Sequence, residues 1–286
     1  MTDATPARVG VLGGGRMGAG IAHAFLLAGS AVTVVERDSE AARAARDRIR
    51  RSVDQSIARG HDAGAADVHS RLTVATEPAA FGPHGLVIEA VPEELGLKLR
   101  ALAAVEAQLA GDAILATNTS SIPLAHLAQA LERPGRLIGL HFFNPVPSST
   151  LVEIVVGTET SRGLPATARS WVRALGKTPI TVRDSPGFAS SRLGVALALE
   201  AIRLVEDGVA SAADIDLAME LGYRHPAGPL RTTDLVGLDV RLSIAEQLER
   251  DLGPRFAPPQ LLRDLVAEGR LGRKSGRGFY EWGDGR

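Results

Sequence analysis

A glycine-rich turn near the start of the chain constrains the fold more than any other stretch. The stretch from Arg8 to Gly18 reads as a strand that runs directly into a turn containing Gly13, Gly15 and Gly18, which have the GxGxxG spacing. One glycine allows a tight turn, one lets the backbone approach a pyrophosphate, and one permits close packing of helix on strand. The apolar residues that follow recur at helical spacing, so the pattern predicts a helix whose N-terminus holds the phosphates.

The acid that ends the second predicted strand indicates which dinucleotide binds. Residues 31–35 are predicted to form a buried strand, and Glu36 follows directly. A carboxylate at this point can hold both hydroxyls of the adenosine ribose, and it repels a 2′-phosphate. The sequence therefore predicts NAD rather than NADP, and only the neighbouring Arg37 keeps NADP open.

Polar side chains follow two further predicted strands. Residues 86–91 read as a central strand, after which Glu93 lies at the start of a helix, and residues 113–116 read as another buried strand. The polar run 117–121 follows it, and we interpret Ser121 as the cap of the next helix. Ligands bind outside the carboxyl ends of parallel strands, so the other polar residues of this run are candidates for a site.

An arginine-rich helix is predicted from Asp38 or Ser39 to about Arg59. It follows the second strand and carries six arginines against three acids outside a narrow apolar stripe. One interpretation is an ordinary solvated helix face, which the sequence alone favours. The other is a landing site for a substrate that bears phosphate. The segment from Gly60 to Ser70 is predicted to be a loop.

A histidine and a buried acid form the candidate acid-base pair. His141 ends an apolar strand beside the polar turn 144–147, and Glu153 interrupts the apolar strand 151–156. A carboxylate inside a sheet needs a partner, and His141 lies one strand away. Glu153 would accept from one ring nitrogen and leave the other as a base. The alternative is a purely structural pair.

The alternation of strands and helices stops near Asp184. Beyond it the sequence shows only helical periods, at residues 189–205, 212–221, 234–252 and 259–267. We therefore predict an α/β chain, with a Rossmann-like, doubly wound, mostly parallel sheet in residues 1–184 and an all-α domain in residues 185–286. The apolar stripes of these helices are too few to bury one another fully, which predicts a homodimer through the helical domain.

Composition excludes several classes of protein. A formal net charge of -1 argues against a nucleic-acid or anionic-membrane partner, and the absence of cysteine removes thiol chemistry and cysteine zinc sites. No metal site is expected. The first residues lack the apolar core of a signal peptide, and no apolar run approaches the ~20 residues that span a bilayer. A cytoplasmic location is the expectation.

Five segments together resemble the 3-hydroxyacyl-CoA dehydrogenase family, of the 3-hydroxybutyryl-CoA dehydrogenase type. They are the glycine turn at 13–18, Ala116-Thr-Asn-Thr-Ser-Ser121, His141-Phe-Phe-Asn-Pro145 with Glu153, Asp184-Ser-Pro-Gly-Phe188, and Gly272-Arg-Lys-Ser-Gly-Arg-Gly-Phe-Tyr280. The resemblance extends from Arg8 to Tyr280. It implies reversible hydride transfer between C3 of an (S)-3-hydroxyacyl-CoA and NAD, in fatty acid β-oxidation or a related pathway.

The resemblance also implies roles for individual residues. His141 would be the general base, Glu153 would orient it, Ser120 would bond the reacting oxygen, and Asn144 would line the same pocket. The expected cofactor contacts are Gly13, Gly15, Arg16, Met17, Gly18, Glu36, Glu93, Lys98 and Asn118. The expected substrate contacts are Ser52 and Arg59, toward the CoA nucleotide, together with Ser120 and Ser191.

One position departs from the family pattern. Related chains commonly have asparagine where this chain has Ser191. A hydroxyl reaches less far than a carboxamide, and a lost neutral hydrogen bond is worth about 0.5–1.5 kcal/mol, so we expect activity to survive while the acyl group becomes uncertain. A bulkier, carboxylated or aromatic acyl chain and an acyl-carrier-protein thioester stay open.

Two other functions compete. Relatives on the same scaffold oxidise a free hydroxy acid or sugar acid, such as gulonate or carnitine, and would not need a CoA site on the arginine-rich helix. A cofactor-binding protein without chemistry, as lens crystallins of this family illustrate, is the non-enzymatic alternative. The joint presence of Ser120, His141, Asn144 and Glu153 argues against it.

Overall fold

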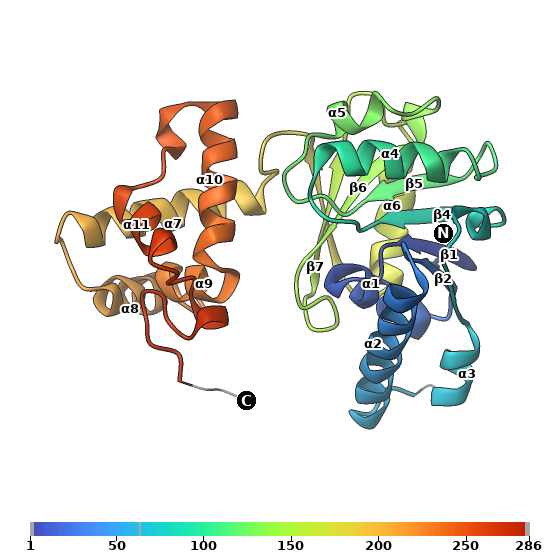
Figure 1. The fold of residues 1–286 in the computed structure, drawn as a ribbon, viewed down its shortest axis with the longest axis horizontal. Helices are drawn as coiled ribbons and strands as arrows, with labels where there is room; N and C mark the ends of the chain where they lie inside the picture. Colours follow the sequence, from blue (N-terminus) through green and yellow to red (C-terminus); the bar gives the residue numbers. More distant parts are fainter. Residues whose placement is uncertain (1–2, 63, 284–286) are drawn as a thin grey trace. The chain divides into compact units, whose positions relative to one another are not determined.

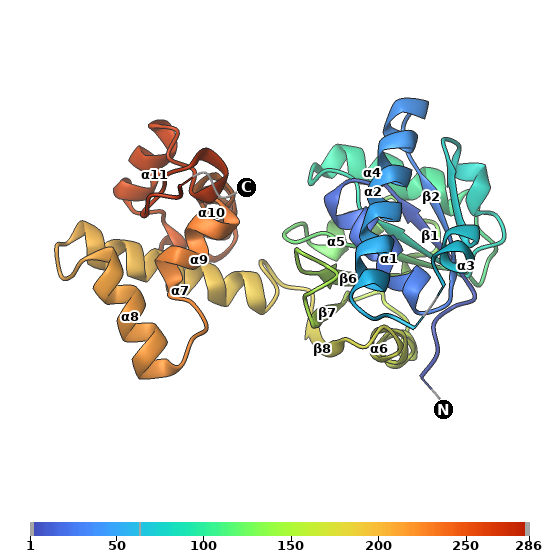
Figure 2. The same cartoon turned by 90° about the horizontal axis from the view of Figure 1, so that it is seen from below.

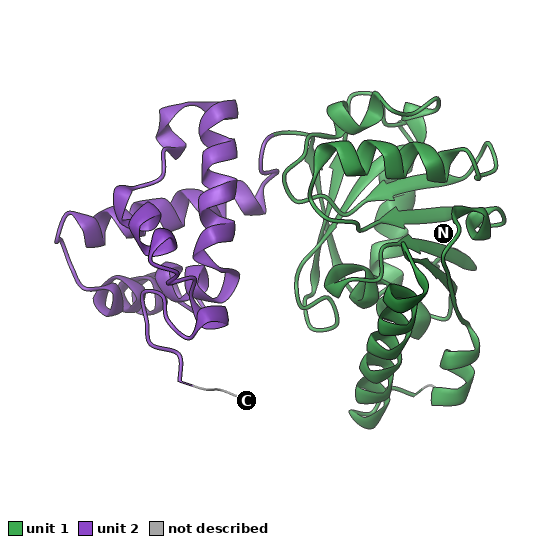
Figure 3. Ribbon diagram, viewed as in Figure 1, with its two compact units in different colours: residues 1–185 green, residues 186–286 purple. Residues whose placement is uncertain are grey.

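The computed structural model describes residues 3–62 and 64–283. The chain divides into two compact units, Met1–Ser185 and Pro186–Arg286, which we call unit 1 and unit 2 (Figure 3). Unit 1 holds every strand that the described residues form, and unit 2 is helical (Figures 1 and 2). The predicted α/β sheet followed by an all-α domain is confirmed.

Unit 1 is built on one eight-stranded sheet with the order β3-β2-β1-β4-β5-β6-β7-β8. All neighbouring strands are parallel except β6 and β7, which are antiparallel. The order reverses direction between β1 and β4, which makes this the switch point where doubly wound sheets bind nucleotides. The strands are β1 (Arg8–Leu12), β2 (Ala31–Val35), β3 (Leu72–Ala75), β4 (Leu86–Glu89), β5 (Ile114–Thr117), β6 (Leu137–Phe142), β7 (Leu151–Val156) and β8 (Thr178–Arg183).

Helices cover both faces of the sheet. One face packs against α1, α2 and α6 through a large apolar core, and the other packs against η1, α4 and α5. Because side chains alternate along a strand, residues next to the core positions of β4, β5, β6 and β7 point toward α4 and α5. The helices of unit 1 are α1 (Arg16–Leu27), α2 (Ser39–Ala58), α3 (Ala65–Ser70), η1 (Pro78–Phe81), α4 (Leu95–Glu106), α5 (Leu124–Ala128), η2 (Pro134–Arg136) and α6 (Leu164–Ala174).

In unit 1 the predicted cap of α2 is confirmed, and the predicted loop before β3 is partly wrong. Asp38 caps α2, since its Oδ1 accepts from the backbone N–H of Ala41 at 2.7 Å. The predicted loop between Gly60 and Ser70 is wrong in its second half, because α3 lies there. This helix is only six residues long and buries a single side chain, Val68, so it leaves almost no periodic signal in the sequence.

Unit 2 is an all-helical cluster around an apolar core drawn from α7, α8, α9, α10 and α11. The predicted single helix over 234–252 is wrong. Gly237, at φ 109°, separates two helices there, and the first of them begins at Pro229. Positive φ is a conformation that glycine adopts without steric cost. The helices are α7 (Ser190–Glu206), α8 (Ala212–Tyr223), α9 (Pro229–Val236), α10 (Leu238–Leu252), η3 (Pro254–Phe256), α11 (Gln260–Ala267) and η4 (Arg273–Ser275).

Asp234 ties the C-terminal segment of unit 2 to α9. Its buried carboxylate accepts from the backbone N–H groups of Phe279 and Tyr280, at 2.9 and 3.0 Å, and from the indole of Trp282 at 2.7 Å. A Cβ on Gly278 would lie 2.2 Å from this carboxylate. Hydrogen bonds to the Asp234 carboxylate therefore hold the glycine-rich segment near the end of the chain in place.

The described residues form no helix with the length and apolar character needed to cross a bilayer.

Stability is expected to fall in mild acid because of His23. This side chain is buried on α1, its Nε2 lies 2.8 Å from Ser56 Oγ, and its buried Nδ1 has no partner among the described residues. Burial, with help from Lys177 and His61, lowers the pKa of His23 to about 4. The unfolded histidine takes up a proton near pH 6.5 and the folded one does not. The contribution of His23 to the free energy of unfolding is therefore fully present above pH 6.5 and is lost as the pH falls toward 4.

The expected loss between pH 7.5 and pH 5 is about 2 kcal/mol from this group. Urea unfolding at the two pH values measures it, and His23→Gln, which keeps a hydrogen-bonding side chain but does not titrate, should reduce the pH dependence by that amount. An unchanged dependence in His23→Gln would show that another group is responsible.

Candidate active site

The glycine turn lies at the switch point of the sheet. Gly13 leaves β1 at φ 90°, and a Cβ on it would meet the carbonyl of Ala90, just beyond β4, at 3.0 Å. A Cβ on Gly18 would come within 1.8 Å of the Gly13 oxygen, whereas nothing lies within 4 Å of the Cβ position of Gly15. The turn is therefore tightly packed at Gly13 and Gly18, and it leaves open space at Gly15, where a bound pyrophosphate requires it. Arg16 and Met17 start α1 directly after it.

Glu36 holds the glycine turn from the next strand. Its Oε1 accepts from the N–H of Gly14 at 2.7 Å, and its Oε2 accepts from the N–H of Arg37 at 3.2 Å. Arg48, on α2, donates to the carbonyl of Gly14 at 2.6 Å. The carboxylate therefore stands beside the turn at the end of β2, where an adenosine ribose would lie.

A buried ion pair lies beneath the ends of β4 and β5. Glu89 is fully buried, and its carboxylate accepts from Lys98 Nζ and Thr117 Oγ1, each at 2.7 Å, and from the N–H of Val91 at 2.7 Å. Lys98, on α4, is also almost fully buried. A buried charge pair is tolerated when further hydrogen bonds satisfy both partners, and each partner here has them.

Lys98 connects this pair to Glu93. Its ammonium lies 3.2 Å from Glu93 Oε2 and 3.2 Å from the carbonyl of Val91. With Glu89 this makes three acceptors for its three protons, and the cofactor contact predicted for Lys98 stays a prediction. Lys98 acts on the site by holding Glu93.

Glu93 accepts hydrogen bonds from the polar run that follows β5. Its Oε1 accepts from Thr119 Oγ1 at 2.6 Å, from the N–H groups of Ser120 and Ser121 at 2.9 and 3.0 Å, and from Ser121 Oγ at 3.0 Å. Burial raises the pKa of Glu93, but Lys98 and these hydrogen bonds outweigh it and hold the pKa below its usual range. Glu93 therefore stays ionised at neutral pH.

Ser121 is not a helix cap, and that prediction is wrong. Helix α5 starts after Pro123 without a side-chain cap, and Asp184 Oδ2 accepts from the N–H of Ala125 at 3.0 Å. Helix α5 begins at Leu124, three residues beyond Ser121, and the serine hydroxyl donates to Glu93 Oε1 instead.

His141 and Glu153 face each other across the β6–β7 ladder. They are register partners in the antiparallel pair, and His141 Nδ1 lies 2.7 Å from Glu153 Oε2. Both side chains are buried, at 6% and 0% exposure. An ionised carboxylate only accepts, so Nδ1 carries the proton and Nε2 is the nitrogen available for proton transfer. Glu89 and Thr117, which are also register partners, point toward the same helix layer.

Asn118 and Asn144 border this pair. Asn118 Oδ1 accepts from the N–H of Phe142 at 2.9 Å, which ties the end of β5 to the end of β6. Asn144 is exposed in the turn after β6. Lys177 holds that turn by donating to the carbonyls of Val146 and Ser149.

The other predicted substrate contacts lie farther along the chain. Ser52 and Arg59 are seven residues apart on or beside α2, so they share one face of it, and Arg59 is exposed. Ser191 lies in the first turn of α7, in unit 2.

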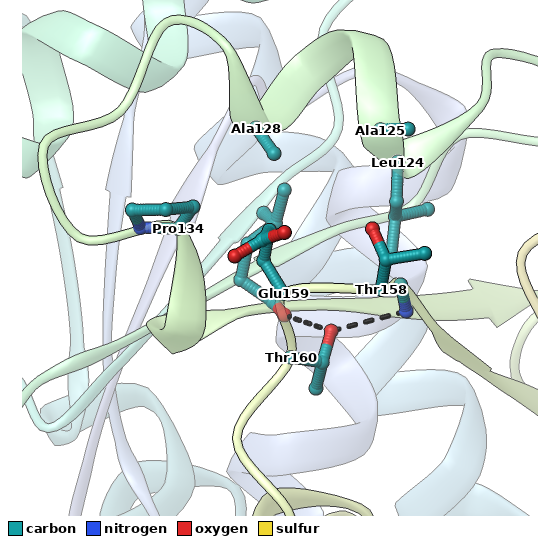
Figure 4. A pocket seen from close by; sticks show the side chains of 9 residues that line it. Leu124, Ala125, Ala128, Pro134, Thr158, Glu159 and Thr160 are labelled. Carbon is teal, nitrogen blue, oxygen red and sulfur yellow. Dashed lines mark hydrogen bonds between the residues drawn. The ribbon is translucent and has the colours of Figure 1, made fainter.

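A pocket in unit 1 lies away from these residues (Figure 4). It is an open hollow of about 190 Å³ between α5, η2 and the end of β7, and its lining includes Leu124, Pro134 and Glu159. The start of β6 borders it, whereas His141 lies near the other end of that strand. The hollow therefore lies at the opposite end of the strands from His141.

Three residues of this site were missed in the sequence, namely Glu89, Thr119 and Arg48. Glu89 gave a usable signal, because a carboxylate inside an apolar strand is the same observation that identified Glu153. Thr119 and Arg48 gave none, since a threonine in a polar run and an arginine among six are not distinguished by spacing.

Comparison with known proteins agrees with this geometry. Residues 8–185 match the family model described as 3-hydroxyacyl-CoA dehydrogenase, NAD binding domain, and residues 187–282 match that of the C-terminal domain. The chain is 41% identical to a 3-hydroxybutyryl-CoA dehydrogenase of Mycobacterium tuberculosis, over 99% of this chain and 100% of that protein. It is 38% identical to the human mitochondrial hydroxyacyl-coenzyme A dehydrogenase, over 96% and 90%.

A solved structure is similar over the whole chain as well. It is the crystal structure of (S)-3-hydroxybutyryl-CoA dehydrogenase from Ralstonia eutropha, with a TM-score of 0.94, 37% identity, and coverage of 98% of this chain and 100% of that one.

Proposed function

Because this chain belongs to the 3-hydroxyacyl-CoA dehydrogenase family of NAD-dependent oxidoreductases, we propose that His141 and Glu153 form its acid-base pair. The reaction is the reversible, NAD-dependent oxidation of an (S)-3-hydroxyacyl-CoA to the 3-oxoacyl-CoA. The observation that supports the proposal is the 2.7 Å contact between His141 Nδ1 and Glu153 Oε2. The pair lies toward the same end of the sheet as the glycine turn, at the carboxyl ends of β1 and β6.

The pair holds a proton at a defined atom. Glu153 keeps the Nδ1 proton in place, so Nε2 accepts the proton of the 3-hydroxyl as the substrate is oxidised and returns it in the reverse direction. The carboxylate stabilises the imidazolium that forms. Ser120 bonds the reacting oxygen, and Asn144 lines the same pocket. Both members of the pair are buried.

NAD, when bound, would supply the acceptor for the hydride of C3, and the residues present fit this cofactor. The open space above Gly15 suits a pyrophosphate, and Glu36 suits a ribose diol. Asn118 directly follows β5, and we propose that it lies beside the nicotinamide half of the cofactor. Lys98 positions Glu93 and, through it, the 119–121 segment that carries Ser120.

The exposed arginines of α2 support a CoA thioester over a free hydroxy acid. Arg59 has no ion pair among residues 3–62 and 64–283, so it is available for a phosphate of CoA, and Ser52 lies on the same face. An acyl-carrier-protein thioester or a free hydroxy or sugar acid is the alternative substrate. A neutral short acyl chain, as in 3-hydroxybutyryl-CoA, is the starting substrate for assays.

An absorbance assay at 340 nm tests the reaction. Acetoacetyl-CoA with NADH should be turned over rapidly, whereas gulonate with NAD should not. Turnover of gulonate and not of the thioester would overturn the proposed reaction and favour the free-acid alternative.

Reversing one charge on α2 tests the CoA site. Arg59→Glu should raise KM for acetoacetyl-CoA several-fold with little change in kcat, because it replaces an attraction to phosphate by a repulsion. Arg50→Glu is the matched control, since nine residues separate it from Arg59 and place it on the opposite face of the helix. The difference between the two variants should shrink in high salt. Equal KM values would remove the CoA site from this helix face.

The helical unit is proposed to hold the dimer contact. Exposed apolar side chains are concentrated in it, namely Leu193, Val209, Leu217, Leu221, Tyr223, Leu235, Val236 and Val240. Large exposed apolar side chains in one domain often mark an interface between proteins. Sedimentation velocity at micromolar concentration should show a homodimer, and a stable monomer would contradict it. A cytoplasmic location and a place in fatty acid metabolism are proposed with the family.

A further inference from the structure

One buried ammonium serves two carboxylates beneath the ends of β4 and β5. Lys98 Nζ lies 2.7 Å from Glu89 Oε1 and 3.2 Å from Glu93 Oε2, and among the described residues neither acid pairs with another cation. Glu89 only accepts hydrogen bonds, as an ionised carboxylate does, and Glu93 stays ionised at neutral pH. We call these three residues the β4 charge cluster. Two carboxylates and one ammonium leave it with one negative charge in excess.

This excess charge is shielded from water. Glu89 and Lys98 are 0% and 1% exposed, and Glu93 is the member whose side chain reaches the surface. Water and salt screen buried charges far less than surface charges. A buried ion pair is often no more stabilising than apolar residues of the same volume, and a second carboxylate adds a further cost. The stability of unit 1 alone therefore does not account for the excess charge.

The β4 charge cluster lies at the half of the crevice that is left for nicotinamide. The strand order reverses between β1 and β4, and a dinucleotide bound at such a point extends over both sides of it. The glycine turn after β1 and Glu36 after β2 suit the pyrophosphate and the adenosine ribose on one side. On the other side Glu89 ends β4, and Glu93 accepts from the N–H of Ser120, which follows β5, at 2.9 Å. The ring that exchanges the hydride is therefore expected beside this cluster.

We infer that the excess negative charge of the β4 charge cluster, supplied by Glu89, stabilises the cationic nicotinamide ring of NAD⁺ over the neutral ring of NADH. The inference rests on the proposed function and deepens it, because it gives a role to a buried residue that the proton transfer does not use. Only the oxidised ring is cationic, so a nearby anion binds the two forms unequally and shifts the bound cofactor toward the oxidised form. In the bound state this favours hydride transfer to the 3-oxoacyl group.

Glu89→Gln removes the excess charge and keeps the shape of the side chain. The amide oxygen can still accept from Lys98 and from the N–H of Val91, and the NH₂ group can donate to Thr117 Oγ1. Isothermal titration calorimetry measures Kd for NAD⁺, for NADH and for ADP-ribose, which lacks the ring. Kd for NAD⁺ should rise about three- to twentyfold, the range that Coulomb's law gives for one unit charge acting on another through a protein interior. Kd for NADH and Kd for ADP-ribose should change little.

Two further variants separate charge from structure. Glu106→Gln is the matched control, since it removes another buried carboxylate, which ends α4 and pairs with Arg133. It should leave all three Kd values unchanged. Adding Lys98→Met to Glu89→Gln removes the cation as well, so Glu93 again leaves one negative charge in the cluster. The ratio of Kd for NAD⁺ to Kd for NADH should then return toward the wild-type value.

The outcomes separate the inference from the proposed function. An equal loss of affinity for NAD⁺ and NADH in Glu89→Gln, or an unchanged ratio of the two Kd values, overturns the inference, because Glu89 would then serve the structure alone. A ratio that stays altered in the double variant does the same. If Glu89→Gln does not fold, Glu93→Gln removes the same charge and must raise the ratio for the inference to stand. Failure of the wild-type protein to bind any of the three ligands overturns the proposed function itself.

Discussion

Replacing His141 by glutamine is expected to lower kcat by about 10²–10⁴, which is the usual contribution of a positioned general base. Glutamine fills similar space and can still bond Glu153, but it does not take up the 3-hydroxyl proton. KM for NADH should change little, because the glycine turn and Glu36 lie on other strands. Steady-state kinetics with acetoacetyl-CoA and NADH measures both parameters.

His84→Gln is the matched control for this variant. His84 is also buried in unit 1, but its Nδ1 contacts the carbonyl of Phe81 near the start of β4, at the other end of the sheet. Its replacement should leave kcat within a factor of about two to three of the wild-type value, since it touches no group of the proposed chemistry. A near-wild-type kcat in His141→Gln would remove His141 from catalysis.

Replacing Glu153 by glutamine is expected to lower kcat by a similar order, about 10²–10³. The amide has nearly the same shape as the carboxylate, so the fold should survive. It no longer stabilises an imidazolium, and it can present its NH₂ group to Nδ1 and move the ring proton to Nε2. The proton acceptor is then lost even though the histidine is present.

A double variant tests whether the two residues act as a unit. His141→Gln with Glu153→Gln should be no slower than His141→Gln alone, because Glu153 acts through the histidine. Glu106→Gln is the matched control, since Glu106 is a buried carboxylate of unit 1 that binds the N–H groups of Glu132 and Arg133. It should alter stability and not kcat. Fully multiplicative losses in the double variant would contradict a shared role.

Much of unit 1 follows from local sequence because its signals are strong and redundant. The strand, the glycine turn and the terminal Glu36 occur in order, and each supports the others. The contact of His141 with Glu153 follows from the cost of burying a carboxylate, which needs no knowledge of the fold beyond two neighbouring strands.

Other features depend on tertiary contacts that no spacing encodes. The helix break at Gly237 needs a positive φ that only the packed structure reveals. The contacts of Ser121 and Lys98 depend on Glu93, which lies 28 and 5 residues away from them along the chain.

The antiparallel pairing of β6 with β7 separates changes that affect the proton-transfer pair from changes that affect substrate preference. Register along this ladder is specified by the apolar pattern of the two buried strands, because a slip of one residue would turn every side chain to the other face of the sheet, so the histidine and its carboxylate stay opposite one another. The connection between the strands carries Asn144, which is proposed to line the substrate pocket, and changes in its other residues can alter the pocket without altering the register. Substrate preference can therefore drift during evolution, or be redesigned, while the proton-transfer apparatus is inherited intact.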